Sequence, residues 1–155
     1  MDQNASIIEN AIKSSLGIIE QDREREIISR RFGLSGQKET LEQIGELLNI
    51  TRERVRQLEK AILVRLRIGA EEGHIEDLPA AEKLLIRNLT ELGRVARTTD
   101  LANKIYGPKA TAADRAKLTF ISAISSNLTA LDENDSYYAA IGIAEYGDAK
   151  TVHAR

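Results

Sequence analysis

The sequence contains no cysteine, no tryptophan and only two prolines among its 155 residues. The lack of cysteine excludes disulfide bonds and thiolate metal sites. Aromatic residues make up only 4% of the chain, so the core must be built mostly from Leu, Ile, Val and Ala, which favours helices over a β-sandwich. The scarcity of proline leaves room for long helices.

Long apolar runs and clusters of reactive side chains are also missing. No run approaches the roughly 18 residues of a membrane-spanning helix, and the first residues lack the basic and apolar regions of a secretory signal. We therefore expect a cytoplasmic protein without membrane contact. His74 and His153 lack partners for metal binding or catalysis, the acids of 132–135 lack the spacing of a calcium loop, and no glycine-rich phosphate loop occurs. We expect no enzyme, no cofactor and no metal.

The net charge of −2 is distributed unevenly along the chain. Residues 51–67 hold six basic and two acidic residues, whereas residues 70–92 hold six acidic and two basic ones. A phosphate backbone responds to the local patch rather than to the total charge. The overall charge therefore does not exclude a nucleic-acid partner for the basic segment.

Helical spacing and turn residues divide the chain into two units. We predict a mainly α fold, in which a helix-turn-helix bundle is followed by a small winged-helix domain with a β-hairpin. The predicted boundaries are a helix-turn-helix domain at 1–69, an acidic linker at 70–79, a winged-helix domain at 80–146 and a tail at 147–155.

Within these units, the helices and strands are predicted from caps and apolar periodicity. The predicted elements are a helix capped by Ser6–Glu9 and ended by Gly17, helices at 21–31, 41–48 and 52–67, a helix ending near Gly93, helices at 99–106 and from Thr111, and strands at 128–131 and 137–143 around the acidic turn 132–135.

The stretch from Thr40 to Arg67 meets the requirements of a helix-turn-helix. Two helices that cross at a tight turn need a small residue at the crossing, and Gly45 supplies it. Asn49 tolerates the left-handed conformation at the turn, and Thr51 can cap the second helix. Val55, Leu58, Ile62 and Leu66 form one apolar stripe along that helix.

The opposite face of the second helix carries side chains that suit DNA. Arg can bind guanine with two hydrogen bonds, Glu can accept from cytosine, and Gln can bind adenine. The candidate base contacts are Arg52, Glu53, Arg56 and Gln57, and the candidate phosphate contacts are Thr40, Thr51, Arg54 and Lys60. The alternative is a solvated face on which Glu53 interacts with neighbours such as Gln57 or Lys60.

Three segments together resemble region 4 of the bacterial sigma-70 family. They are Arg23–Leu34, Thr40–Gly45 and Thr51–Glu59, within a resemblance that spans about residues 5–68. The resemblance implies recognition of the promoter −35 element and docking on the flap of the RNA polymerase β subunit. By this resemblance, contact with DNA bases falls to Arg52, Glu53, Arg56 and Gln57, and contact with the DNA backbone falls to Thr51 and Arg54.

Two departures from the sigma-70 pattern matter. Ala61 and Val64 stand where the family often has cations that contact activators or phosphate, so contact with an activator is in doubt. No segment resembles region 2, whose aromatic residues melt the −10 element. We therefore do not expect the chain by itself to be a complete sigma factor. The alternative is that it is the C-terminal part of a longer sigma factor.

Residues 80–146 more weakly resemble the HARE-type winged helix, a family that includes the delta subunit of some RNA polymerases. The resemblance rests on 95–102, the helix from Thr111 and the strand 136–141. A second candidate basic surface consists of Arg94, Arg97, Arg115 and Lys117. The acidic turn 132–135 would repel phosphate, so we favour protein over DNA as the partner of this unit. Tyr137, Tyr138 and Tyr146 are candidate contact residues, although packing of the hairpin also explains the first two.

Two hypotheses of different classes follow. The first is a sigma-like transcription factor that binds double-stranded promoter DNA and RNA polymerase. The second is an interaction protein with little DNA affinity, which binds the polymerase flap or an anti-sigma partner.

Overall fold

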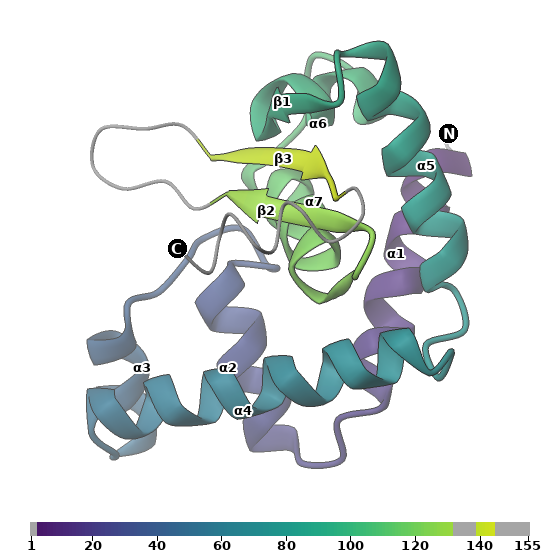
Figure 1. Ribbon diagram of the computed structural model, residues 1–155. Coiled ribbons are helices and arrows are strands. Elements are labelled where there is room, and N and C mark those ends of the chain that lie inside the picture. The colour runs from purple at the N-terminus through teal and green to yellow at the C-terminus, as the bar shows by residue number, and fades with distance from the viewer. Residues whose placement is uncertain (1–2, 132–138, 145–155) are drawn as a thin grey trace.

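Helices dominate the computed structural model, which describes residues 3–131 and 139–144 (Figure 1). The described elements are α1 Gln3–Gly17, α2 Asp22–Phe32, α3 Leu41–Leu48, α4 Arg52–Glu71, α5 Leu78–Glu91, β1 Val95–Arg97, α6 Thr98–Tyr106, α7 Ala112–Ile124, β2 Leu128–Leu131 and β3 Ala140–Ile143. The predicted mainly α fold, with a helix-turn-helix followed by a small winged unit, is confirmed by this order. Within the described residues, no helix is both long and apolar enough to cross a membrane.

Several helices begin and end at the residues that the sequence indicates. Thr40 and Gln43 form a capping box at the start of α3, and Thr111 and Asp114 form another at the start of α7. Gly33 ends α2 in the left-handed conformation, and its N–H donates to the Ser29 carbonyl. Local polar signals therefore fix these boundaries.

The start of α1 differs from the prediction. Ser6 lies inside this helix, which begins at Gln3, so the predicted cap at Ser6–Glu9 is wrong. Tertiary contact explains the extra turn, because the Asn4 side-chain amide donates to the Ile105 carbonyl of α6 at 3.3 Å. The contact with α6 therefore holds residues 3–5 in the helix, whereas a cap at Ser6 would have started the helix after them.

The small sheet has the strand order β1-β3-β2, and both pairs are antiparallel. The predicted strand at 128–131 is confirmed, and β3 covers the last four residues of the strand predicted at 137–143. The strand β1 was not predicted, and it pairs Val95 with Gly142. The acidic turn 132–135, the tail 147–155 and the three tyrosines Tyr137, Tyr138 and Tyr146 lie outside the described residues.

The buried residues form one cluster that extends through both predicted units. Helix α1 packs against α5, α6 and α7, and α7 also contacts α2 and α4. Figure 1 shows α1 and α5 side by side, with α4 crossing beneath them. The division into two domains stays a prediction, and the two predicted units share their core.

The acidic segment between the predicted units is anchored to the rest of the chain. Ile75 and Leu78 are each 2% exposed, and the Ser14 hydroxyl donates to the Asp77 carboxylate at 2.7 Å. Helix α4 continues through Gly69 to Glu71, and a Cβ at Gly69 would lie 3.0 Å from the Ile18 Cδ1 atom. The glycine lets α4 pass close to Ile18, so it marks a close contact rather than the end of the helix.

Candidate nucleic-acid interface

Helices α3 and α4 cross at a position that only glycine fits. A Cβ built on Gly45 would lie 2.7 Å from the Ile50 carbonyl oxygen, which is well inside van der Waals contact. Asn49 adopts φ 61° and ψ 46° at the turn, and its N–H donates to the Gly45 carbonyl. These are the small residue and the left-handed turn that the sequence predicts for a helix-turn-helix.

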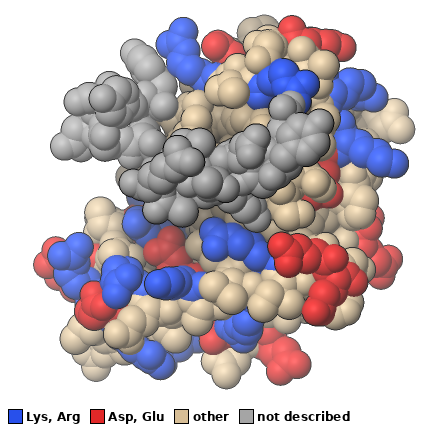
Figure 2. All heavy atoms as spheres, in the orientation of Figure 1, with Lys and Arg blue, Asp and Glu red and all other residues tan. Residues whose placement is uncertain are grey.

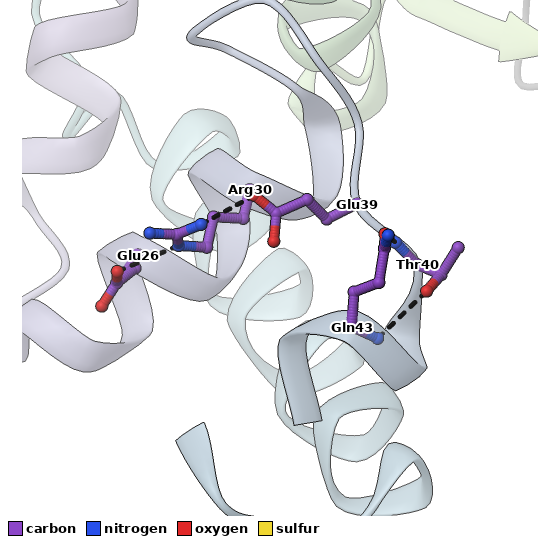
Figure 3. A network of polar contacts seen from close by, with 5 residues as sticks. All are labelled: Glu26, Arg30, Glu39, Thr40 and Gln43. Carbon is purple, nitrogen blue, oxygen red and sulfur yellow. Dashed lines mark hydrogen bonds and ion pairs between the residues drawn. The ribbon is translucent and has the colours of Figure 1, made fainter. Parts of the chain in front are cut away.

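Polar contacts fix the start of α3 against α2 (Figure 3). The Thr40 hydroxyl accepts from the Gln43 N–H at 3.0 Å, and the Gln43 side chain accepts from the Thr40 N–H at 2.8 Å. Arg30 on α2 binds Glu26 at 2.9 Å and Glu39 at 2.7 Å. Hydrogen bonds to these two carboxylates raise the pKa of Arg30, so the guanidinium stays charged. The loop before α3 is thereby tied to the helix before it.

The inner face of α4 is buried, and its flanks are tied to α2. Val55 and Ile62 are fully buried, which is the stripe that the sequence predicts. Arg31 binds Glu59 at 3.1 Å, and Arg65 binds Glu24 at 2.7 Å. With α4 held on this side, its outer face is left for a partner.

The candidate contact residues lie together at one end of the molecule. All eight are exposed, and they occupy the caps of α3 and α4 and the first turns of α4: Thr40, Thr51, Arg52, Glu53, Arg54, Arg56, Gln57 and Lys60. In Figure 2, cationic and acidic side chains are interspersed over the end of the molecule formed by α3 and the start of α4. The structure therefore places the predicted base and phosphate contacts, all exposed, at the caps of α3 and α4 and along the first turns of α4.

Two ion and hydrogen-bond pairs organise the exposed face of α4. Arg56 donates to both carboxylate oxygens of Glu53, from Nε at 3.0 Å and from Nη2 at 2.6 Å. Arg54 donates to the Gln57 side-chain oxygen at 3.4 Å. The hydrogen bonds with Arg56 lower the pKa of Glu53, and the same contact raises the pKa of Arg56. Both side chains therefore remain charged, and they face each other as an ion pair on the exposed face of α4.

The main partner of Glu53 is Arg56, three residues along the helix, which makes the bidentate contact. A hydrogen bond with Gln57, one of the two expected neighbours, also lowers the pKa of Glu53, but by less than the contact with Arg56. The i, i+3 spacing of Glu53 and Arg56 was available as a signal, because such pairs face each other on a helix.

The second candidate basic surface does not assemble in the same way. Lys117 faces α1 and binds Glu9 at 2.9 Å. Arg115, two residues earlier on α7, donates to the Ala110 carbonyl at 3.3 Å, and side chains two residues apart leave a helix on nearly opposite sides. Arg97 lies near Asp100, 3.6 Å away, and Arg94 adopts a positive φ of 78° just before β1.

Helix α7 packs against the first half of the chain as well as against its own half. Phe120 is fully buried and packs against Phe32 of α2. Arg67 of α4 donates from Nε to the Ala123 carbonyl at 2.9 Å. The helix that the sequence left open to DNA or protein therefore contacts the helix-turn-helix half of its own chain.

No group of three or more metal-ligating side chains occurs in the part of the chain that the structure describes.

The exposed residues of α3 and α4 described above lie within a segment that matches a known protein family. Residues 21–67 match the family model described as sigma-70, region 4. This confirms the predicted resemblance for that segment. The match ends before residues 80–146, where the predicted resemblance to a HARE-type winged helix finds no support.

Curated relatives match over nearly the same length. The RNA polymerase sigma factor SigA1 of Synechococcus elongatus is 52% identical over 46 residues, which are 29% of this chain and 12% of the relative. The sigma factors SigA of a Nostoc species and of a Synechocystis species are each 50% identical over 46 residues, again 29% of this chain, and the matched segment covers 12% and 11% of their lengths. The chain thus spans only about an eighth of these relatives. No solved structure matches the chain.

Proposed function

We propose that the chain is a sequence-specific DNA-binding protein of transcription initiation, which resembles the −35-reading part of a bacterial sigma factor. One observation carries this proposal. The exposed side chains of Thr51–Arg54, Arg56 and Gln57 form a row at the start of α4 in the helix-turn-helix, inside the segment that matches sigma-70 region 4.

The chemistry of the row suggests a role for each side chain. In the major groove, Arg52 and Arg56 suit guanine, Glu53 suits the cytosine amino group, and Gln57 suits adenine. Phosphate contacts fall to Thr40, Thr51, Arg54 and Lys60. The first two cap the N-termini of α3 and α4, where backbone N–H groups favour an anion.

RNA polymerase is the proposed protein partner of the first half. The matched relatives are named as RNA polymerase sigma factors, and the sigma-70 resemblance implies docking on the β-subunit flap. Retention of purified core polymerase by the immobilised chain, after nuclease treatment, tests this contact without DNA. Anti-sigma and activator proteins remain candidate partners of the same half.

We propose that the second half has a HARE-like winged fold and makes protein contacts rather than DNA contacts, beginning with those to the first half of its own chain. Support comes from α7, which packs against α2 and α4 through Phe120 and the Ala123 carbonyl. Lys117 is occupied by Glu9, so Lys117→Gln is expected to leave DNA affinity unchanged. A loss of affinity in this variant would instead indicate a second DNA surface.

Fluorescence anisotropy with two labelled duplexes tests DNA reading. One duplex carries a −35 element and the other has the same base composition in shuffled order. Tighter binding of the first duplex, with affinity that falls steeply as salt rises, is the expected result. Equal binding of both duplexes would contradict sequence-specific reading.

A second candidate function is an interaction protein with little DNA affinity. The bidentate pair between Glu53 and Arg56 favours it, because this pair partly neutralises a cation that would otherwise attract phosphate. Retention of polymerase together with undetectable binding of either duplex would support this second function against the first.

A further inference from the structure

The strand β2 lies at an edge of the sheet and borders a cavity of about 400 Å³. The strand order β1-β3-β2 leaves one side of β2 without a neighbouring strand. Residues 128–130 of β2, the second half of α7 and one face of α4 line the cavity. In Figure 1, β2 is the strand of the sheet nearest to α2 and α4. The cavity therefore separates the sheet from the helix-turn-helix half of the chain.

The register of the ladder shows which backbone groups of β2 lie at its free edge. Hydrogen-bonded and non-hydrogen-bonded pairs alternate along an antiparallel ladder. The Ala144 N–H donates to the Asn127 carbonyl at 3.0 Å, so two residues further along β2 it is Thr129 that bonds to β3. The N–H and C=O groups of Leu128 and Ala130 therefore point away from β3, toward the free edge.

This edge lacks the usual protection. Proteins blunt edge strands with charged side chains, proline or bulges, but β2 reads Leu-Thr-Ala-Leu and pairs with β3 in unbroken register. Leu128 is only 1% exposed, and both Leu128 and Ala130 line the cavity. Buried backbone donors and acceptors need hydrogen-bond partners, and one added strand would supply them to both residues.

A buried hydroxyl on the same strand also lacks a partner. Thr129 lines the cavity and is 7% exposed, and its Oγ1 atom has no hydrogen bond within the described part of the chain. Gly142, the residue opposite it on β3, has no side chain to offer. Threonine or serine across from a threonine on a neighbouring strand can make such a bond. The hydroxyl and the free edge thus favour the same kind of ligand, an extended peptide.

The wall formed by α4 indicates which side chains such a peptide would carry. Glu59, Leu63 and Arg67 line the cavity, and their spacing of four residues puts them on one face of the helix. Glu59 is already bound by Arg31. Arg67 donates from Nε to the Ala123 carbonyl, a neutral acceptor, and within the described residues its guanidinium has no acidic partner. An acidic group beside Arg67 and an apolar one beside Leu63 would match this wall.

We propose that the free edge of β2 binds an extended, acidic peptide segment of a partner protein, which adds a strand beside Leu128 and Ala130 and places a carboxylate on Arg67. In this mode of recognition, main-chain hydrogen bonds give affinity and the side-chain contacts give specificity. The bound strand would lie between β2 and α4 and so contact both halves of the chain. The site goes beyond the proposed function and stands whether or not α4 reads DNA.

Fluorescence anisotropy of labelled peptides with the full chain tests this site. The probe is Asp-Val-Thr-Val-Thr-Asp with blocked ends, so that either strand direction brings a carboxylate toward Arg67. The wild type should bind this probe saturably. Two further probes carry N-methyl groups on both valines or on both threonines. Because alternate amides of a strand face the same neighbour, one of these probes should lose binding and the other should keep it.

Three variants test the contacts on the protein side. Arg67→Gln should weaken binding of the probe about tenfold, the usual effect of losing a hydrogen bond to a charged group. Arg87→Gln, on α5 and outside the lining, removes the same charge elsewhere and should bind like the wild type. Ala130→Pro removes an N–H that the ladder with β3 does not use, so the sheet should still form while binding falls.

Amide hydrogen exchange locates the probe without any substitution. In the peptide-free chain, the Leu128 and Ala130 amides should exchange faster than the Thr129 amide, which is paired with β3. A saturating amount of the probe should slow the exchange of Leu128 and Ala130 and leave that of Thr129 nearly unchanged.

Four results would overturn the proposal. The first is the absence of saturable binding by the wild type. The second is an equal effect of both N-methylated probes, which would exclude strand pairing. The third is wild-type affinity in Arg67→Gln or in a folded Ala130→Pro variant. The fourth is slow exchange of Leu128 and Ala130 without peptide: loss of this protection on dilution would assign the edge to a second copy of the chain, and its persistence would assign the edge to the chain itself.

Discussion

The ring of Phe120 on α7 packs edge-on against the ring of Phe32 at the end of α2, with the ring centroids 5.2 Å apart and the planes at 75°. This geometry is a favoured one for aromatic pairs. It joins the helix-turn-helix half to the winged half at a point where Phe120 is fully buried. The two halves should therefore depend on each other for stability.

Replacement of Phe120 tests this dependence. Phe120→Ala leaves a cavity in a shared core and should lower the free energy of unfolding by about 3–5 kcal/mol. Phe120→Leu keeps most of the volume and should cost clearly less. Denaturant unfolding followed by circular dichroism measures both values. An unchanged midpoint in Phe120→Ala would mean that the contact contributes nothing.

The crossing of α3 and α4 should not tolerate a methyl group. In Gly45→Ala the new Cβ meets the Ile50 carbonyl at 2.7 Å, so the helices must move apart, at a cost of about 1–3 kcal/mol. DNA affinity should fall as well, because α4 moves relative to α3. Gly17→Ala is the matched control, since a Cβ at Gly17 meets nothing within 4 Å. If the two variants unfold at the same midpoint, the close approach at Gly45 is not a constraint.

Lys60 should act as a phosphate contact rather than as a base contact. Lys60→Gln is expected to weaken binding to all duplexes equally, and to reduce the slope of log K against log salt by about 1. Lys83→Gln, on the exposed side of α5, removes the same charge at a distance and should leave the slope unchanged. Anisotropy titrations over a series of salt concentrations give the slopes. A loss confined to one DNA sequence would assign Lys60 to base reading instead.

Glu53 should contribute specificity at the expense of general affinity. Glu53→Gln removes a negative charge and the bidentate contact with Arg56, so binding to the shuffled duplex should become tighter. Discrimination against a duplex altered at the contacted cytosine should fall, by an amount of about 1–3 kcal/mol. The ratio of the two dissociation constants measures this. An unchanged ratio would show that Glu53 reads no base.

The sequence was a good guide where structure depends on nearby residues. The capping box of Thr40 and Gln43, the left-handed Asn49 and the small Gly45 all act within ten residues of chain. Each is a local steric or hydrogen-bonding demand, and each was predicted from residue type and spacing. For the same reason the exposed row on α4 could be located from helical periodicity alone.

Distant contacts explain what the sequence did not indicate. The three residues of β1 form a strand only because β3, more than forty residues later, pairs with them. The early start of α1 depends on Ile105, and the passage of α4 through Gly69 depends on Ile18. No local pattern encodes these encounters.

Base reading by α4 is the central claim, and an anisotropy comparison of wild type with the double variant Arg56→Ala/Gln57→Ala tests it most directly. Both side chains are exposed, so the double variant should fold normally, as circular dichroism can verify. It should lose most of its preference for the duplex with the −35 element over the shuffled duplex, since each base contact is worth about 1–3 kcal/mol. An undiminished preference in the double variant would contradict base reading by this helix.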